Sequence, residues 1–410
     1  MQLPPDFISY THRMMGEERF SRYLKSFNEA VPVSIRLNPL KLGQHHTWEV
    51  IGAKPVGWCH EGFYLPRRPQ FTMDPLLHAG CYYVQEAASM FVSHVLRQYV
   101  SRPVKMLDLC AAPGGKSTAA IASVPAGSTL YSNEPMRQRA HVLLENITKW
   151  GYPDCTVTND YPADYRKAGC SFDVILCDVP CSGEGMFRRD EQTIGEWSTQ
   201  QVEKCRLLQR DIVSDAWNCL QPGGLLLYST CTFNTQENEE NVRWLLDHFD
   251  DATVLPVDTR PEWGITGSLL PGFEEPVYRF IPGITQSEGL FLCVVQKVSD
   301  APVSVQRPGR RPKSPAKDSP LHVLTPPPAT ILADAPIVAL DYAQAIAYLR
   351  GEAFALPADT PRGLVTVAFE GQPLGPMKNI GTRANNLYPK EWRIKTTHIP
   401  QDYEAILRHT

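Results

Sequence analysis

Short apolar runs alternate with amphipathic segments across the middle of the chain, from residue 101 to residue 300. The runs have the length and branched composition of buried strands, and the segments between them repeat apolar positions at helical spacing. Alternating strands and helices predict a parallel, doubly wound α/β sheet. The predicted strands are 105–110, 128–133, 155–159, 173–178, 224–230 and 289–298.

Four of the segments between the strands predict helices. One runs into the Pro-Gly-Gly turn at 222–224, which is a strong helix-stop signal. Another begins with Glu237 and Glu239, and acids favour the first turn of a helix because they interact well with its dipole. The predicted helices are 117–123, 137–150, 200–220 and 235–248.

Residues 1–100 precede this core and have mixed periodicity. An edge strand is predicted at 32–38, and a helix leading into the core is predicted at 85–99. We therefore expect a small N-terminal α+β domain over 1–100 and a core domain over 101–300.

The region after the core changes composition twice. Residues 301–333 are rich in proline, serine and basic residues, a composition that cannot pack a core and predicts a linker. Residues 334–410 regain apolar periodicity, with a helix predicted at 341–350 and strands at 363–369 and 391–397. This C-terminal unit is close to the smallest size that folds alone.

The overall composition predicts a soluble protein of two or three domains. The chain has 410 residues, of which 43% are hydrophobic and 20% charged, and it contains no apolar run of the ~20 residues that a membrane-spanning helix needs. The first residues lack the basic and apolar pattern of a secretory signal. The eleven cysteines are therefore expected to be reduced thiols in a cytoplasmic protein.

The net charge of −4 does not by itself indicate a nucleic-acid binder, so phosphate contacts would have to come from local patches. Two patches are candidates, and either could instead be merely solvated. In the second, Tyr388 and Trp392 interleave with the charges and could stack on bases. The first patch consists of Arg307, Arg310, Arg311, Lys313 and Lys317, and the second of Lys378, Arg383, Lys390, Arg393 and Lys395.

A turn of small residues follows the first core strand, at the sheet edge where α/β proteins bind ligands. It lacks both the dinucleotide-binding and the P-loop glycine patterns. The pair Gly114-Gly115 nevertheless allows the backbone to approach a ligand closely. The turn consists of Cys110, Ala111, Ala112, Pro113, Gly114, Gly115 and Lys116.

Acidic residues end the next two strands. Glu134 lies where a ribose diol would bind, and Asp160 could accept a hydrogen bond from an adenine amino group. Each alone could equally be a turn or cap residue. Together with the glycine turn they indicate an adenosine that carries a non-phosphate group, and hence S-adenosylmethionine as the cofactor.

Two cysteines, Cys181 and Cys231, follow strand ends at the same sheet edge, and Asp178 precedes the first of them. Thiols there can form covalent bonds with a substrate. A redox pair is a poorer interpretation because the spacing is not C-x-x-C. No cysteine–histidine cluster has metal-ligand spacing, so no metal is expected. Three other cysteines fit the usual role of a small buried apolar residue: Cys110, Cys177 and Cys219.

Three strings resemble motifs of the RNA 5-methylcytosine methyltransferase family: 108–117 its cofactor motif, and 178–183 and 229–232 its two cysteine motifs. The resemblance implies a Rossmann-like class I methyltransferase core. It also implies that Cys231 is the nucleophile and that Cys181 assists product release.

The chemistry of such an enzyme explains why these groups are needed. Cytosine C5 is a poor nucleophile, and a thiolate that adds at C6 makes C5 reactive enough to attack the methyl group. An acid near N3, here Asp178, offsets the charge that develops on the ring. Asp178 is also expected to be one of the cofactor-binding residues. The C5 proton must then leave and the cysteine must be eliminated.

The resemblance extends to both ends of the chain. The strings 34–39 and 83–90 resemble the family's N-terminal region, and 381–389 resembles the C-terminal PUA-like domain of a ribosomal RNA methyltransferase subfamily. It implies a monomer that acts on ribosomal RNA or the small ribosomal subunit and binds no membrane. Deletion of 334–410 is expected to weaken RNA binding while the catalytic core stays folded. Transfer RNA remains an alternative substrate, and a non-catalytic RNA-binding assembly factor remains an alternative function.

Overall fold

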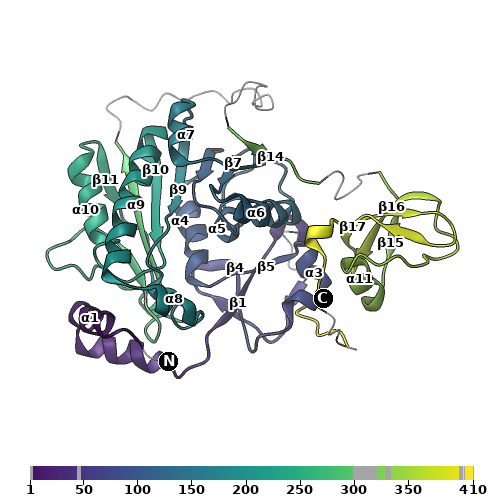
Figure 1. Cartoon of the computed structure of the whole chain (residues 1–410), viewed down its shortest axis with the longest axis horizontal. Coiled ribbons are helices and arrows are strands. Elements are labelled where there is room, and N and C mark those ends of the chain that lie inside the picture. Colours follow the sequence, from purple (N-terminus) through teal and green to yellow (C-terminus); the bar gives the residue numbers. More distant parts are fainter. Residues whose placement is uncertain are drawn as a thin grey trace.

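The computed structural model describes residues 3–43, 48–298, 321–327, 334–396, 400 and 402–409. A large sheet occupies the middle of the molecule, and the C-terminal strands lie at one end of it (Figure 1). None of the helices in these ranges is both long enough and apolar enough to cross a membrane.

The central sheet is mixed. Its strand order is β11-β13-β10-β9-β6-β7-β8-β14, and β12 also pairs with β13. Five strands are parallel, as predicted, but β13 runs antiparallel to β10, a direction that the alternation of strands and helices did not predict. The six predicted strands are confirmed as β6 (Lys105–Asp108), β7 (Thr129–Asn133), β8 (Cys155–Thr158), β9 (Phe172–Asp178), β10 (Leu220–Thr230) and β13 (Leu290–Lys297). The added strands are β11 (Ala252–Leu255), β12 (Tyr278–Phe280) and β14 (Val323–Leu324).

Successive residues of the central strands point to opposite faces and pack into two separate cores. Leu107, Ile175 and Leu226 are buried on one face, with the helices α9 (Thr199–Cys219) and α10 (Glu239–His248). Met106 and Leu176 are buried on the other, with α4 (Phe91–Tyr99) and α5 (Gly115–Ile121). Both faces of the sheet are therefore covered, as the doubly wound prediction required (Figure 1).

The predicted helices over 117–123, 137–150 and 200–220 are confirmed as α5, α6 (Arg137–Trp150) and α9. The prediction over 235–248 is too long, because residues 235–238 form a turn before α10. The helix predicted over 85–99 also begins too early, because a 3-10 turn at Ala88–Met90 precedes α4. The Glu86 carboxylate accepts hydrogen bonds from the backbone N–H groups of Ala88 and Ser89 in this turn. Short helices complete the core at α7 (Pro162–Lys167) and α8 (Glu191–Glu196).

The N-terminal region contains a four-stranded sheet of order β3-β4-β1-β5. The predicted edge strand is β1 (Val33–Leu37), and the edge position is wrong because β1 lies between β4 and β5. Ser34, Ile35 and Arg36 are all buried. A strand at the edge of a sheet would not require all three side chains to be buried. The other elements are α1 (Pro5–Ser26), α2 (Pro39–Leu42), β2 (Trp48–Val50), β3 (Lys54–Val56), β4 (Cys59–Leu65), α3 (Pro75–His78) and β5 (Tyr82–Val84).

The C-terminal region forms a four-stranded sheet of order β15-β16-β17-β18. The helix predicted at 341–350 and the strand predicted at 363–369 are confirmed. The strand predicted over 391–397 is wrong for residues 391–396, which form no strand. A 3-10 helix at Lys390–Trp392 follows Pro389 there, and residue 397 lies outside the described residues. The elements are β15 (Ile337–Ala339), α11 (Tyr342–Leu349), β16 (Gly363–Phe369), β17 (Gln372–Asn379), β18 (Ala384–Asn386) and β19 (Leu407–His409).

The C-terminal and N-terminal regions share one hydrophobic core. Ile35 and Leu76 from the N-terminal region are fully buried in the same cluster as Leu349 and Val365 from the C-terminal region. In addition, β19 pairs with β2. Removal of 334–410 would expose these apolar side chains of the N-terminal region. The shared cluster contains no residue of the catalytic core, so the expectation that the core stays folded without 334–410 remains a prediction.

Part of the predicted linker is structured. Residues 321–327 lie against the central sheet, where β14 pairs antiparallel with β8. A linker over the whole of 301–333 is therefore wrong, because Leu321 is buried among apolar residues of the sheet. The first basic patch, at 307–317, lies outside the described residues.

Candidate active site

The small-residue turn connects β6 to α5 at the carboxyl edge of the sheet. Gly114 has φ +111°, a conformation that favours glycine. A Cβ on Gly115 would lie 3.4 Å from the Tyr83 ring, so the backbone packs closely there. The Ala111 N–H donates to Asn133 O at 2.8 Å, which ties the turn to the end of β7.

Asp108, the last residue of β6, is a site residue that sequence reasoning did not select. Its Oδ2 accepts from Ser117 Oγ at 2.6 Å, whereas Oδ1 is buried and has no hydrogen-bond partner among the described residues. Burial raises the pKa of this carboxyl group to about 7. An unpaired acceptor beside the turn fits the ammonium group of a methionine-type cofactor.

Glu134 is buried behind the turn. Its Oε1 accepts from Met136 N at 2.9 Å, and its Oε2 lies 3.2 Å from Arg139 Nη1. The alternative role of a turn residue therefore holds for Glu134. It does not exclude a cofactor contact, because a carboxylate can accept about four hydrogen bonds.

Asp160 and the strand ends beside it are joined by the side chain of Asn133. The Asn133 Nδ2 donates to Leu109 O at 3.0 Å and to Asp160 O at 2.9 Å, and its Oδ1 accepts from Asp160 N at 3.0 Å. The Asp160 carboxylate itself contacts His322. Asn133 thus holds the ends of β6, β7 and β8 in one arrangement, a role that the sequence alone did not indicate.

Asp178 and Lys116 form an ion pair at the centre of the site. Lys116 Nζ lies 2.8 Å from Asp178 Oδ2, and Ser229 Oγ donates to Asp178 Oδ1 at 2.8 Å. Burial alone would lower the pKa of Lys116, but the charge of Asp178 and the hydrogen bond to it outweigh burial and the pKa is raised. The ion pair therefore presents a fixed donor and a fixed acceptor to the site.

The structure brings Cys181 and Cys231 together. Their Sγ atoms are 3.1 Å apart, and the Cys231 N–H donates to Cys181 Sγ at 3.3 Å. The pKa of Cys181 is raised well above its ordinary value, first by the hydrogen bond to the Cys231 sulfur and then by burial. Cys181 therefore stays a thiol. The buried Cys177 and Cys219 belong to the apolar core, as expected.

The helix predicted from residue 235 begins only at Glu239, eight residues after Cys231. A buried polar network replaces the predicted first turn. Glu237 accepts from Ser182 N at 3.0 Å and from Asn234 Nδ2 at 2.7 Å, and burial raises its pKa to about 7. These bonds tie the segment after Cys181 to the segment after Cys231.

Glu184 contributes a second carboxylate to the same network. Its Oε2 accepts from the backbone N–H groups of Phe233 and Asn234, each at 2.8 Å. Sequence reasoning missed Glu184 and took Glu237 for a helix-capping acid. Only the contact between segments about fifty residues apart shows their role.

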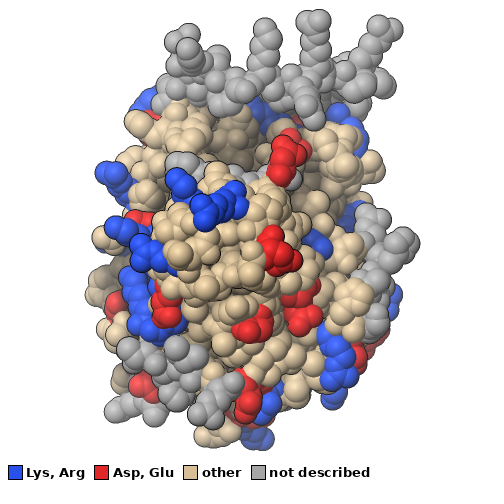
Figure 2. All heavy atoms as spheres, turned by 90° about the vertical axis from the view of Figure 1, so that its right-hand side faces the viewer, with Lys and Arg blue, Asp and Glu red and all other residues tan. Residues whose placement is uncertain are grey.

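The two aromatic residues of the second basic patch differ in exposure. Tyr388 is 3% exposed and packs on Tyr348 with ring centroids 5.3 Å apart, and Trp392 packs against Lys149 at 5.5 Å. The stacking prediction is therefore wrong for Tyr388, whereas for the partly exposed Trp392 it remains a prediction. Lys and Arg side chains are interspersed with carboxylates on this face of the molecule (Figure 2). The exposed basic residues of the patch are Lys378, Arg383, Lys390 and Lys395.

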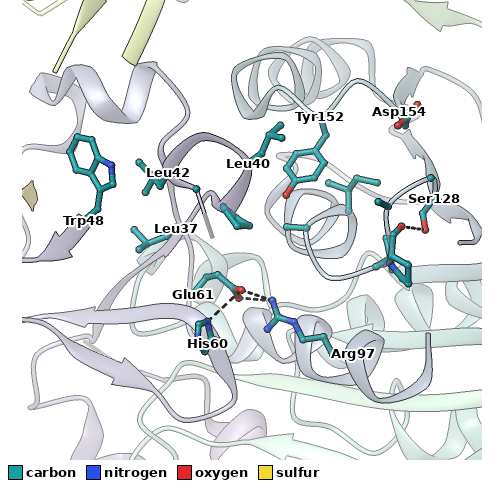
Figure 3. Close-up of a pocket in the computed structure, with 18 of the residues that line it drawn as sticks. Leu37, Leu40, Leu42, Trp48, His60, Glu61, Arg97, Ser128, Tyr152 and Asp154 are labelled. Atoms are coloured by element: carbon teal, nitrogen blue, oxygen red, sulfur yellow. Dashed lines mark hydrogen bonds and ion pairs between the residues drawn. The ribbon is translucent and has the colours of Figure 1, made fainter. Parts of the chain in front are cut away.

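A cavity of about 830 Å³ lies away from the cysteines. It opens between the N-terminal region, at Leu40 and Trp48, and the residues that precede β7 and β8, at Ser128 and Asp154 (Figure 3). Ser128 and Asp154 lie at the amino edge of the parallel strands, opposite the turn 110–116. The cavity is therefore separate from the candidate active site. No group of three or more metal-ligating side chains occurs in the described ranges.

Three family models match successive parts of the chain. The model of the 16S rRNA methyltransferase RsmB/F matches residues 101–296. The model of the N-terminal domain of 16S rRNA methyltransferase RsmF matches residues 3–87. The model of the methyltransferase RsmF PUA domain matches residues 335–394.

Curated relatives carry the name ribosomal RNA small subunit methyltransferase F. The protein of Erwinia tasmaniensis is 32% identical over 317 residues, covering 73% of this chain and 64% of that protein. The protein of Escherichia coli O17:K52:H18 is 32% identical over 340 residues, covering 77% of this chain and 68% of that protein. The chain thus spans slightly less than two thirds of the Erwinia relative.

Solved structures share the fold. A methyltransferase homologue from Pyrococcus horikoshii is 25% identical with a TM-score of 0.58, covering 72% of this chain and all of that one. NSun6 from the same organism, solved with SFG, has a TM-score of 0.59 at 20% identity and covers 72% of this chain and 99% of that one. The chain belongs to the ribosomal RNA small subunit methyltransferase F family, a family of S-adenosylmethionine-dependent methyltransferases.

Proposed function

We propose that this protein transfers a methyl group from S-adenosylmethionine to C5 of cytosine in small-subunit (16S) ribosomal RNA, through a covalent bond between Cys231 and C6. The observation that carries the proposal is the pair of sulfur atoms 3.1 Å apart, at the sheet edge that also holds the Asp178–Lys116 ion pair. Membership of the family supports ribosomal RNA as the substrate. The site combines a nucleophile, a polar contact for the base and a second thiol.

The environment of Cys181 supports Cys231 as the nucleophile. Cys181 keeps its proton because its pKa is raised, and its S–H can donate to the neighbouring sulfur. A hydrogen bond from a neutral donor stabilises a thiolate. In the proposed step the Cys231 proton passes to water, the thiolate adds to C6, and its lone pair becomes the new S–C bond.

The Asp178–Lys116 ion pair is the group that contacts the polar edge of the base. Adding a thiolate at C6 pushes electron density towards N3, where a hydrogen-bond donor stabilises it. Lys116 brings a proton on Nζ, and Asp178 is held by Ser229 so that its carboxylate keeps one orientation. Asp178 acts near N3 together with Lys116, which sequence reasoning had assigned only to the cofactor turn.

S-adenosylmethionine supplies the electrophilic methyl group when it is bound. The turn 110–116 would hold it, with Asp108 facing its ammonium group, Glu134 its ribose and Asp160 its adenine. The unpaired, buried Oδ1 of Asp108 is the feature that fits this cofactor best.

Product release requires two bonds to break. After methyl transfer the C5 proton leaves to a base, its electron pair forms the C5–C6 double bond, and the C6–S bond opens to return Cys231 as a thiolate. Cys181 touches the Cys231 sulfur and is placed to assist this step.

The enzyme would act as a cytoplasmic monomer on naked RNA or on the ribosomal subunit.

Replacing Cys231 with alanine should abolish methyl transfer while S-adenosylhomocysteine binding stays within about twofold of wild type. The cofactor contacts come from other residues, whereas no bond to C6 can form. The measurement is tritium transfer from labelled cofactor to small-subunit RNA, with binding followed by calorimetry. A Cys219→Ala variant, which changes a buried core cysteine, is the matched control. Residual transfer within about tenfold of wild type would exclude Cys231 as the nucleophile.

Replacing Cys181 with alanine should allow attack but impair release. The variant should accumulate a covalent protein–RNA adduct, visible as a slow band on a denaturing gel when RNA and cofactor are present. The Cys181→Ala, Cys231→Ala double variant should form no adduct. Free turnover of the single variant would make Cys181 a structural thiol, and an adduct in the double variant would show that Cys231 is not the attacking residue.

Cofactor affinity should rise with pH up to about 7 because of Asp108. Burial holds the pKa of Asp108 at about 7, so below that pH the carboxyl group is protonated and must release its proton before it can attract an ammonium group. S-adenosylhomocysteine should bind about fifteenfold more tightly at pH 7.0 than at pH 5.5, since the ionised fraction of Asp108 falls from about one half to about 3% between these two pH values. Asp108→Asn should remove this dependence. Parallel pH profiles for the two proteins would contradict the assignment.

A further inference from the structure

The segment 321–327 lies along the edge of the central sheet, beside the part of the candidate active site that would hold the adenosine. Val323 and Leu324 pair antiparallel with Thr158 and Val157 of β8. His322 O also accepts from Asn159 N at 3.0 Å, so the pairing continues to the residue before Asp160. In Figure 1, β14 lies beyond β7 at the edge of the sheet that faces the C-terminal strands. The segment is thus an added strand next to the end of β8.

Apolar contacts on both sides hold this segment in place. Leu321 is 8% exposed and belongs to the cluster that contains Leu109 and Tyr165. Leu324 packs against the cluster that contains Ala111 and Ala112 of the cofactor turn. These two apolar contacts, one by a buried and one by a partly buried leucine, hold the short strand on the sheet.

His322 engages both oxygens of the Asp160 carboxylate. The His322 backbone N–H donates to Oδ2 at 2.9 Å, and His322 Nδ1 lies 2.7 Å from Oδ1. The Asp160 side chain is 2% exposed, whereas the His322 side chain is 81% exposed. Two contacts to two oxygens fix the plane of the carboxylate, and each oxygen keeps a further lone pair.

We propose that His322 is a positioning residue for cofactor recognition: it orients the Asp160 carboxylate so that a free lone pair accepts the adenine amino group. The proposal rests on the proposed function, in which Asp160 binds adenine. A fixed carboxylate accepts from the 6-amino group of adenine and repels the 6-oxo group of hypoxanthine. His322 therefore sets how strongly the site distinguishes the two bases. A site built to pair with one polar group rejects an analogue that lacks it.

The test compares S-adenosylhomocysteine with S-inosylhomocysteine, which carries oxygen in place of the amino group. Dissociation constants are measured by calorimetry on the full chain. Wild type should bind the adenosyl compound at least about tenfold more tightly. His322→Ala should weaken the adenosyl compound by about tenfold and leave the inosyl compound nearly unchanged, so that the preference disappears.

Two further variants separate positioning from loss of structure. His322→Asn keeps a side-chain N–H that can reach Asp160, so it should retain most of the preference. His12→Ala changes a histidine of α1 that contacts Glu17 and Phe20, far along the chain from Asp160, and should match wild type. If both variants of His322 bind neither compound, β14 has a structural role and the positioning role is overturned.

The outcomes also separate this proposal from the proposed function. If Asp160→Ala loses the preference but His322→Ala keeps it, Asp160 reads the adenine and the positioning role of His322 is overturned alone. If wild type has no preference, Asp160 does not read the amino group and both assignments are overturned. If wild type binds neither compound, the proposed cofactor site itself fails.

Discussion

The parallel pairing of β9 with β10 is the constraint on which the site depends. Asp178 and Ser229 are partners in this register, and the chain leaves both strands at the same edge. Cys181 follows three residues after Asp178, and Cys231 follows two residues after Ser229. Two cysteines fifty residues apart in sequence therefore meet with their sulfur atoms 3.1 Å apart. A slip of one residue would turn these strand-end side chains to the opposite face.

The buried polar network converts this pairing into a rigid site. Glu184 and Glu237 are nearly inaccessible to water, and each accepts backbone N–H groups from the opposite cysteine-bearing segment. An unpaired polar group at this depth would cost about 1–3 kcal/mol, so each carboxylate requires its partners in place. The network holds the cysteines in contact and restricts the motion of the turns that carry them.

The sequence was sufficient to place residues whose position depends on one strand. It places the turn 110–116, Asp178, Cys181 and Cys231 at or just after the ends of strands that the apolar pattern predicts. It was insufficient where a role depends on contacts between distant segments. His322 meets Asp160 across 162 residues, in a region whose composition resembles a linker. The shared core of the two terminal regions was missed because each region shows its own periodicity and neither shows its partner.

The central claim is that Cys231 bonds to C6 of the target cytosine. The most direct measurement uses wild-type protein, cofactor and small-subunit RNA in which cytidine is replaced by 5-fluorocytidine. Fluorine at C5 cannot leave as a proton does, so the covalent intermediate is trapped after methyl transfer. Digestion and mass spectrometry should then find a methylated fluoronucleotide on the peptide that contains Cys231. A nucleotide attached to Cys181 would contradict the account, and so would the absence of any adduct.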